Sequence, residues 1–428
     1  MKYLSSLKNK NLPNKICLLR VDLNLASAEL HRTNAELRRK KFRVSQREVS
    51  VNLRLTGVLP TIKFLIGRGA KVVILSHRGR PTKVQSSKFK VQSYTLKPFT
   101  ATLSKLLKKP VKFIDLKKDF KAVKTIIKKA PKSSVFLLEN LRFSPGEDKN
   151  DKKFAKKLAS LGDFYVNDAF SVNHRKNASV VAMTKFLPAY AGLLLEKEIK
   201  NLSMAVKNPK HPLVVILGGA KISDKIGVIK NFLKRADYFL IGGGVANTFF
   251  AAQGLPIYNS LYEKEMVLTA RQLLKLKKII LPIDSAISVK GRKKEILDIG
   301  PRTIEKYNQI IKKAKTIIWN GPMGYFENPK FAKGSKAVTQ AILKSHAFAI
   351  IGGGETTSLF GSAQRYAENY VELRRKKFRV GPREVSVSPR MFISTGGGAM
   401  LQYLAGKKLP GIAALDNSRA SLATGGKP

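Results

Sequence analysis

A repeated alternation of short apolar runs with amphipathic helical patterns is the feature that most constrains the fold of this chain. The runs recur along almost the whole sequence, and glycines or basic and polar residues follow them. This alternation is typical of parallel sheets covered by helices on both faces. The runs predict strands over residues 16–23, 72–75, 111–114, 135–138, 164–166, 214–217, 238–241, 279–283, 316–319, 348–351 and 391–393.

The length of the chain favours two domains. Its 428 residues exceed what one hydrophobic core usually holds. Residues 189–206 have the pattern of one long helix, ended by Asn208-Pro209, and such a helix can join two domains. The predicted fold class is therefore α/β, with two doubly wound parallel-sheet (Rossmann-like) domains joined by a helix and hinge. Ligands on such sheets bind outside the carboxyl ends of the strands, so the residues after each strand are the candidates for function.

One strand ending, GGAKISDK at residues 218–225, has the character of an anion site. Glycines let backbone N–H groups approach a ligand, and the N-terminus of the helix that follows favours negative charge. Lys221 and Lys225 are spaced i, i+4, so we expect both on one face of the first helical turn. The segment is not a Walker A loop, because the GxxxxGK[ST] pattern is absent. Taken alone, a plain tight turn explains it equally well.

Glycine-rich endings recur in the second half of the chain, at residues 218–219, 242–244, 320–324, 352–356 and 396–398. Their repetition in one domain predicts a backbone cradle for a nucleotide. Glu355 would be the nearest carboxylate for Mg²⁺, which prefers one or two carboxylates together with phosphate oxygens. Glu327 is a candidate for hydrogen bonding to ribose hydroxyls, and a solvated loop acid is the alternative.

The strand endings of the first half are basic or polar. They read RVDLN, SHRGRP, ENLRF and VNDAF, and His174-Arg175 follows the last. Arg54 lies just before a helical pattern that starts near residue 59. The planar guanidinium group suits phosphate and carboxylate ligands. Brought to one sheet edge, these side chains would bind a small polyanion, although each arginine alone could be an ordinary surface residue.

The chain carries a large positive charge, since 81 Lys and Arg against 28 Asp and Glu give +53. The lysines are spread over polar helix faces, and no common nucleic-acid-binding signature is present. We therefore expect a solvated basic surface that binds nucleic acid nonspecifically at low salt and no membrane partner. A single cysteine, Cys17, and the lack of a membrane-length apolar run or signal-peptide pattern predict a cytoplasmic protein.

Taken in order, the motifs resemble those of the phosphoglycerate kinase family. RVDLN, SHRGRP, ENLRF, VNDAFSVNHR, GGAKISDK, WNGPMGYFE, GGGET and STGGGA run from Arg20 to Ala399. The resemblance implies reversible, Mg²⁺-dependent phosphoryl transfer from 1,3-bisphosphoglycerate to ADP in glycolysis, giving 3-phosphoglycerate and ATP. It further implies a monomer and direct in-line transfer with hinge closure.

The resemblance also implies roles for individual residues. The phosphoglycerate would be held by Asp22, Asn24, Arg54, His77, Arg80, Arg142 and Arg175. The nucleotide site would contain Gly219, Lys221, Lys225, Gly243, Asn320, Glu327, Gly353, Gly354, Glu355 and Thr356. The catalytic groups would be Arg54, Lys221 and Gly397, and Glu355 would hold Mg²⁺. Glu355 stands where aspartate is commoner, and Arg78 stands where an apolar residue is usual.

On this basis the chain is expected to divide into four parts. These are a phosphoglycerate-binding domain (1–188), an interdomain helix (189–206), a nucleotide-binding domain (207–404) and a C-terminal segment that returns to the first domain (405–428).

A near-identical segment occurs twice in the chain. Residues 36–51 (ELRRKKFRVSQREVSV) and 372–387 (ELRRKKFRVGPREVSV) match at 14 of 16 positions. They lie within insertions over about 26–51 and about 368–390, where the family has shorter connections. We interpret both as insertions of one mobile coding element, tolerated as surface loops. The alternative is a dedicated RNA- or polyanion-binding arm.

Two other functions compete with this kinase at the sequence level. A related kinase could act on another small carboxylate or acyl phosphate, because the arginines specify only a small polyanion. A basic nucleotide- or RNA-binding protein on an inactive kinase scaffold would be expected to lack Arg54 or Lys221, and both are present.

Overall fold

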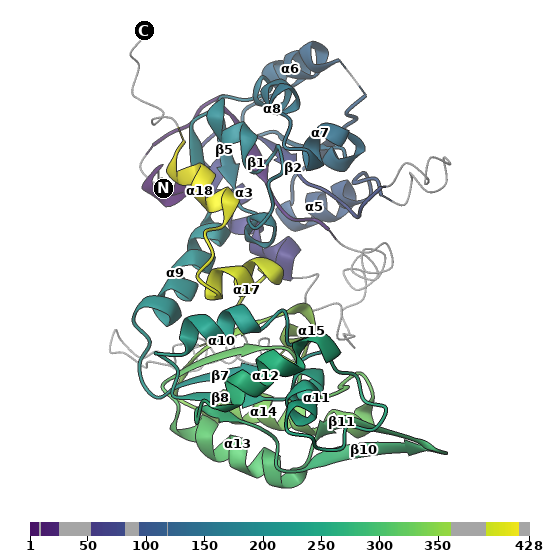
Figure 1. Cartoon of the computed structure of the whole chain (residues 1–428). Helices are drawn as coiled ribbons and strands as arrows, with labels where there is room; N and C mark the ends of the chain where they lie inside the picture. The colour runs from purple at the N-terminus through teal and green to yellow at the C-terminus, as the bar shows by residue number, and fades with distance from the viewer. Residues whose placement is uncertain (8–9, 25–52, 82–93, 118, 361–390, 419–428) are drawn as a thin grey trace. The chain divides into compact units, whose positions relative to one another are not determined.

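The computed structural model describes residues 1–7, 10–24, 53–81, 94–117, 119–360 and 391–418, so both copies of the repeated segment lie outside the described residues (Figure 1). The chain forms two compact units. Unit 1 contains residues 1–199 and 408–428, and unit 2 contains residues 200–407. Helix α9 (Leu193–Lys207) spans the boundary between them.

Unit 1 is built on a six-stranded parallel sheet with the order β3-β4-β2-β1-β5-β6. Its strands are β1 (Ile16–Arg20), β2 (Lys71–Leu75), β3 (Val111–Ile114), β4 (Val135–Leu138), β5 (Phe164–Asn167) and β6 (Ala189–Ala191). Its helices are α3 (Leu59–Ile66), α5 (Phe99–Leu107), α6 (Phe120–Lys129), α7 (Pro145–Asp148), α8 (Lys152–Ala159) and α18 (Pro410–Asp416). Its 3-10 turns are η1 (Leu4–Leu7), η3 (Leu141–Phe143), η4 (Phe170–Val172) and η5 (Ala182–Lys185).

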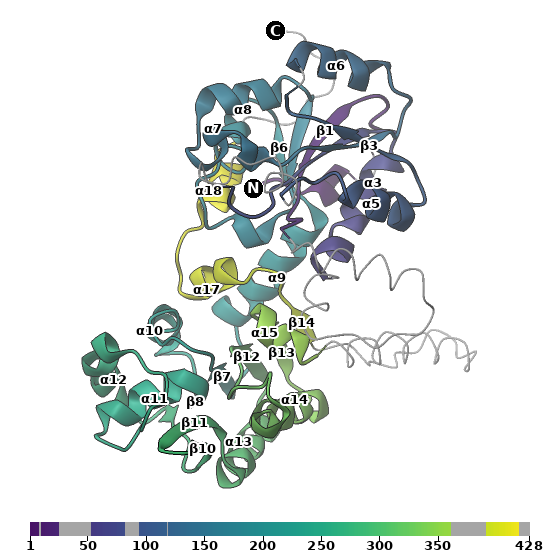
Figure 2. The ribbon, with the colours of Figure 1, turned by 90° about the vertical axis from the view of Figure 1, so that its right-hand side faces the viewer.

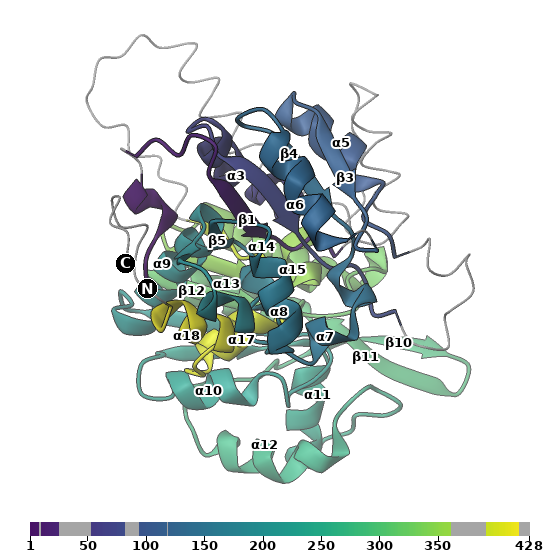
Figure 3. The same cartoon turned by 90° about the horizontal axis from the view of Figure 1, so that it is seen from above.

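Helices cover both faces of the unit 1 sheet. Ile62 and Leu65 of α3 and Phe99 of α5 are fully buried in one core cluster with strand residues such as Leu19 and Ile74. Helices α7 and α8 lie on the opposite side of the strands from α3 and α5 (Figures 2 and 3). Because both faces are covered, strands such as β1 and β2 are buried at every position.

Unit 2 has a second six-stranded parallel sheet, in the order β14-β13-β12-β7-β8-β9. Its strands are β7 (Leu213–Leu217), β8 (Tyr238–Ile241), β9 (Ile279–Ile280), β12 (Thr316–Asn320), β13 (Phe348–Gly352) and β14 (Met391–Ile393), and an antiparallel hairpin pairs β10 (Ser285–Lys290) with β11 (Lys293–Ile299). Its helices and 3-10 turns are α10 (Ile226–Phe232), α11 (Gly243–Ala252), η6 (Lys264–Met266), α12 (Val267–Leu274), α13 (Pro301–Lys313), η7 (Pro329–Phe331), α14 (Lys333–Lys344), α15 (Gly354–Ser358) and α17 (Gly398–Leu404).

The core of unit 2 lies between its strands and helices α13 and α14. Trp319 of β12 is fully buried there beside Tyr307 of α13 and Val338 of α14. Helices α10, α11 and α12 lie on the other side of the strands (Figures 1 and 2). The strand order reverses between β1 and β5 in unit 1 and between β7 and β12 in unit 2. Such reversal points open a crevice at the carboxyl ends of the strands.

These observations confirm the predicted fold class and most of the predicted strands. The strand predicted over 16–23 ends at Arg20, and the one predicted over 279–283 ends at Ile280, just before Pro282 in the chain. Hairpin β10–β11 was not predicted, because its polar, half-exposed residues lack a continuous apolar run.

The expectation of one helix over residues 189–206 is wrong at its start. Residues Ala189–Ala191 form β6, which pairs with β5 at the sheet edge. Asp168 Oδ1 accepts hydrogen bonds from the N–H groups of Leu194 (2.9 Å) and Leu195 (3.0 Å). It thereby supplies partners to backbone N–H groups in the first turn of α9 that have none within the helix. A Cβ at Gly192 would lie 2.3 Å from that same oxygen, so only glycine fits between strand and helix.

Candidate active site

The predicted phosphoglycerate residues gather at the carboxyl ends of four neighbouring strands of unit 1. Asp22 and Asn24 follow β1, His77 and Arg80 follow β2, and Arg142 lies in η3 after β4. Arg175 comes from the segment after β5. Arg54, which precedes α3 in the chain, joins them because its Nη1 lies 3.4 Å from Asp22 Oδ2.

Asp22 is the anionic centre of this group. Its Oδ1 accepts a hydrogen bond from the Asn24 N–H (3.0 Å), and its Oδ2 accepts one from the Ser171 hydroxyl. Burial by itself would raise the pKa of Asp22, but Arg54, His77, Ser171 and the Asn24 N–H together lower it to about 2. Asn24 in turn accepts a hydrogen bond from the Gly79 N–H at 2.7 Å, which joins the loops after β1 and β2.

Positive charge exceeds negative charge around Arg142 and Arg175. Arg142 Nη1 donates to the Gly79 carbonyl (2.6 Å), and its Nε donates to Asp148 Oδ1 (3.1 Å). Burial, followed by the nearby charges of Arg142 and Arg80, lowers the pKa of Arg175. A bound polyanion would stabilise the charged form of Arg175 against this repulsion.

Two basic residues of the same motifs lie outside this group. Arg78 is 4% exposed, donates to the Thr95 carbonyl at 2.9 Å, and stacks over the Phe99 ring at 5.5 Å. The unusual arginine in SHRGRP therefore contributes to packing beside α5. Arg20, the last residue of β1, is 1% exposed, and its Nη2 lies 3.1 Å from His77 Nδ1.

In unit 2, the endings of β7 and β12 approach each other through their glycines. The Gly218 N–H donates to the Asn320 carbonyl (3.0 Å), and the Gly219 N–H donates to the Pro322 carbonyl (2.8 Å). A Cβ at Gly321 would lie 2.1 Å from the Gly218 carbonyl oxygen, and the φ of Gly321 is +91°. Glycine is therefore required where the sheet order reverses.

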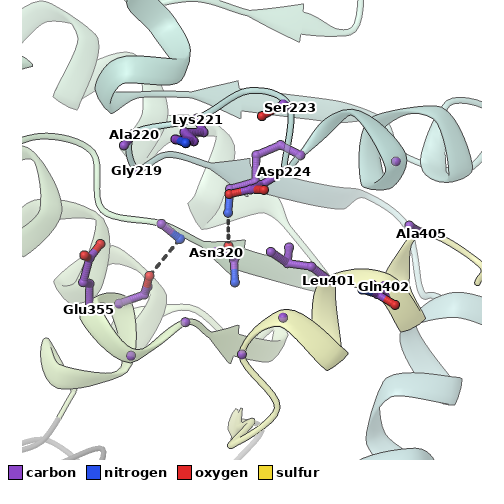
Figure 4. A pocket seen from close by; sticks show the side chains of 18 of the residues that line it. Gly219, Ala220, Lys221, Ser223, Asp224, Asn320, Glu355, Leu401, Gln402 and Ala405 are labelled. Carbon is purple, nitrogen blue, oxygen red and sulfur yellow. Dashed lines mark hydrogen bonds between the residues drawn. The ribbon is translucent and has the colours of Figure 1, made fainter. Parts of the chain in front are cut away.

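Two pockets open at this point and share Gly219, Ala220 and Glu355 in their walls. The larger, of about 760 Å³, contains Gly219, Lys221, Lys225, Asn320, Gly353, Gly354, Glu355, Thr356 and Gly397 (Figure 4). The smaller, of about 250 Å³, contains Gly219, Gly243, Glu327 and Glu355. The structure thus brings together every residue that the sequence placed at the nucleotide, and it places Gly397 with them.

The expected helical pairing of Lys221 and Lys225 is wrong. Helix α10 begins only at Ile226, because Ile222 to Lys225 form a turn in which the Lys225 N–H donates to the Ile222 carbonyl at 2.8 Å. Lys225 is 7% exposed and donates to Asn320 Oδ1, whereas Lys221 is exposed. Burial lowers the pKa of Lys225, and the carboxylates of Asp224 and Glu355 oppose that shift.

Sequence reasoning missed several residues of these pockets. Asp224, the residue before Lys225 in the chain, also lines the larger pocket (Figure 4). Its signal was its place within GGAKISDK. The smaller pocket is walled by Asn247, Leu261, Ile296, Leu297 and Tyr325. Ile296 and Leu297 belong to β11, so a pocket wall comes from the hairpin that the periodicity did not reveal.

The residues present are suited to a magnesium ion carried in with a nucleotide. Asp224 and Glu355 supply two carboxylates to the larger pocket. Within the described residues, no group of three or more His, Cys, Asp or Glu side chains could hold a metal alone. This pattern fits Mg²⁺, which is commonly bound through one or two carboxylates together with phosphate oxygens.

Comparisons with known proteins match the chain to one family over nearly its whole length. The sequence model of a family described as "Phosphoglycerate kinase" matches residues 7–407. Phosphoglycerate kinase of Lactobacillus gasseri is 43% identical, over 85% of this chain and 91% of its own length. That of Pseudothermotoga lettingae is 39% identical, over 97% and 99% respectively.

Solved structures extend this similarity to the fold. Phosphoglycerate kinase from Pyrococcus horikoshii has a TM-score of 0.74 and 34% identity, covering 97% of this chain and 98% of its own. The Coxiella burnetii enzyme has a TM-score of 0.72 and 34% identity, covering 95% and 97%.

The two parallel sheets and the residues at their carboxyl edges define the class of two-domain α/β kinases. The chain belongs to the phosphoglycerate kinase family, whose members are phosphotransferases with a carboxyl group as acceptor.

Proposed function

We propose that this chain catalyses reversible phosphoryl transfer from 1,3-bisphosphoglycerate to ADP, giving 3-phosphoglycerate and ATP in glycolysis. Family membership supports this activity over an inactive nucleotide- or RNA-binding scaffold. The single observation that carries the proposal is the convergence of the predicted nucleotide residues on two pockets with shared walls at the β7–β12 reversal.

In unit 1, the phosphoglycerate would be bound by the basic group at the sheet edge. Arg80, Arg142 and Arg175 would bind the phosphate, because clustered guanidinium groups pair well with a doubly charged anion. Asp22 and Asn24 would orient the rest of the molecule together with His77. Arg54, held near Asp22, would also stabilise the transferring phosphoryl group.

In unit 2, the smaller pocket would hold the adenosine and the larger pocket the phosphates. Gly243 and Glu327 would line the nucleoside side, whereas Asn320 and Lys225, which line the larger pocket, would lie at the phosphates. Lys221 and the N–H groups around Gly397 would neutralise charge on the migrating phosphoryl group. Glu355, with Asp224 nearby, would hold Mg²⁺, which when bound neutralises phosphate charge.

Catalysis would then consist of positioning and charge neutralisation, with direct in-line transfer and no covalent enzyme intermediate. Water must be kept from the phosphoryl group, so we propose hinge closure during each turnover. We also propose that the protein acts as a cytoplasmic monomer with the domain segments given above, except that the interdomain helix is α9 (Leu193–Lys207). Among the described residues, no helix combines the length and apolar character needed to cross a lipid bilayer.

The proposal is tested by a coupled assay with 3-phosphoglycerate and Mg-ATP. The unaltered chain should turn over, and Lys221→Ala should lower kcat by about 10²–10³-fold, as loss of one electrostatic stabiliser typically does. Lys336→Ala is the matched control, because Lys336 is an exposed lysine of α14 that lines neither pocket. A folded, unaltered chain without turnover would refute the proposed activity.

A further inference from the structure

A chain of buried polar groups connects α7 to the phosphoglycerate side of unit 1. Its members come from four separate segments: Glu147 from α7, Ser179 from the loop before η5, Arg20 from the end of β1, and His77 from the loop after β2. All four are nearly inaccessible, with exposures of 0%, 0%, 1% and 2%. Of these, the sequence motifs assigned a role only to His77.

Glu147 and Ser179 together fix the position of the Arg20 guanidinium. Glu147 accepts hydrogen bonds from the Ser179 hydroxyl (2.6 Å) and the Ser179 N–H (3.0 Å). Since its single proton is donated to Glu147, the Ser179 hydroxyl can accept a bond from Arg20 Nε, at 2.8 Å. Arg20 Nη2 lies 4.0 Å from Glu147 Oε1, so two buried opposite charges balance each other.

Arg20 then determines which nitrogen of His77 can carry a proton. Its Nη2 lies 3.1 Å from His77 Nδ1. A guanidinium group donates hydrogen bonds and cannot accept them, so Nδ1 must be the acceptor. The ring proton is therefore on Nε2, at the opposite side of the imidazole.

The surroundings of His77 favour the neutral ring. Burial, Arg20, Arg142 and Arg175 lower its pKa, while Asp22, whose Oδ1 lies 3.9 Å from Nδ1, opposes them. As a result, the pKa of His77 lies well below its usual value. His77 is thus a neutral N–H donor at physiological pH.

We propose that Glu147 and Ser179 are positioning residues that, through Arg20, hold His77 as the Nε2–H tautomer for donation to an anionic oxygen of the substrate. This inference rests on the proposed function, because it assumes that His77 contacts phosphoglycerate. It assigns a role to Glu147 and Ser179, which belong neither to the predicted phosphoglycerate residues nor to the walls of the nucleotide pockets.

The first test is spectroscopic and requires no activity. The protein is labelled with ¹⁵N-histidine and studied by NMR. The chain has five histidines, and the ring signals of His77 are those missing from the spectrum of His77→Gln. The unaltered chain should show a protonated Nε2 and an unprotonated Nδ1 at neutral pH. A protonated Nδ1 of His77 would overturn the proposal, whatever the activity of the chain.

The second test uses Ser179→Ala, which removes the hydroxyl between Glu147 and Arg20. We expect the KM for 3-phosphoglycerate to rise by about 10- to 100-fold, as displacement of a positioned group does, with the KM for Mg-ATP unchanged. The His77 signals should shift toward a mixture of tautomers. Glu147→Gln should act in the same direction.

Tyr165→Phe is the matched control. The Tyr165 hydroxyl lies in the same buried region and donates to the Ser179 carbonyl at 2.7 Å, so it bonds the backbone of Ser179 and not the hydroxyl that accepts from Arg20. Tyr165→Phe should lower stability while leaving both KM values and the tautomer unchanged. If Ser179→Ala behaved like Tyr165→Phe, Glu147 and Ser179 would have a purely structural role. Absence of turnover in the unaltered chain would instead refute the proposed function, and the tautomer would still be measurable.

Discussion

Individual carboxylates in this chain acquire opposite acid–base properties from their surroundings. Arg54, His77 and Ser171 outweigh burial and lower the pKa of Asp22 to about 2. Asp298 is also buried, but among the described residues its partners are two backbone groups, the Gly334 N–H (2.8 Å) and the Ile299 N–H (2.9 Å), and burial raises its pKa to about 6. Charged groups near a buried carboxylate therefore decide whether its pKa is raised or lowered. The residues next to it in the sequence do not reveal which charged groups these are.

The raised pKa of Asp298 predicts a pH-dependent stability of unit 2. Folding holds the Asp298 proton more tightly than the unfolded chain does, so the free energy of unfolding should fall as pH rises from about 4 to about 6. A change in pKa from 3.8 to about 6 corresponds to at most about 3 kcal/mol. Asp298→Asn should lack this fall, because asparagine does not titrate.

Urea unfolding followed by tryptophan fluorescence measures this effect within unit 2. Trp319 is the only tryptophan of the chain and is fully buried in the unit 2 core. The difference between the curves of the unaltered chain and Asp298→Asn isolates the one carboxyl group from all others. Parallel curves across pH 4–6 would contradict the prediction.

At the scale of elements, the glycines after β7 and β12 bring two loops into contact at the nucleotide pockets. A Cβ at Gly218 would lie 2.0 Å from the Pro322 carbonyl oxygen, and one at Gly321 would lie 2.1 Å from the Gly218 carbonyl oxygen. The Gly321 N–H also donates to the Thr356 hydroxyl (2.8 Å), which links β12 to α15. The shape of the larger pocket, which would hold the phosphates, is thus determined by backbone packing. Within it, Lys225 donates a hydrogen bond to Asn320.

Gly321→Ala should weaken nucleotide binding and destabilise unit 2. The new Cβ would lie 2.1 Å from a backbone oxygen, and the residue would keep a positive φ of +91°. Steric displacement and backbone strain should together cost about 2 kcal/mol or more. Isothermal titration with ADP and thermal unfolding would measure the two effects.

Gly254→Ala is the matched control for Gly321→Ala. Gly254 also has a positive φ (+75°), but a Cβ there would have nothing within 4 Å. It should show only the cost of left-handed backbone and leave ADP affinity unchanged. Equal losses in the two variants would show that the close approach of β7 and β12 is unimportant for binding.

At the scale of the whole molecule, the chain combines two similar sheets with a strongly basic surface. The net charge is +53, and each repeated segment has six basic and two acidic residues, so the pair contributes +8. Most of the positive charge therefore belongs to the rest of the chain. Polyanion binding should be nonspecific and should weaken steeply with salt.

Deletion of residues 36–51 and 372–387 should leave the kinase intact. We expect kcat and both KM values within about twofold of those of the unaltered chain, because long surface insertions cost little loop entropy. Affinity for single-stranded RNA at low salt should fall only modestly. The coupled assay and a filter-binding titration at two salt concentrations measure both properties.

The control for this deletion replaces each segment by a Gly/Ser linker of equal length, which separates charge from chain length. Activity that appears only after deletion would mean that the insertions obstruct the enzyme. Loss of RNA binding in both variants would favour a dedicated binding arm instead.

The sequence by itself determined the sheet class and most strands, and it predicted the candidate site residues. These properties follow from local patterns: apolar runs bounded by glycines predict buried parallel strands, and motifs such as GGAKISDK and WNGPMGYFE specify their endings. Only the tertiary structure decided that residues Ala189–Ala191 form an edge strand, that Lys225 is buried against Asn320, and that Glu147 reaches His77 through Ser179 and Arg20. Each depends on groups distant in the chain, and long-range pairing and burial leave no periodic signal in the sequence.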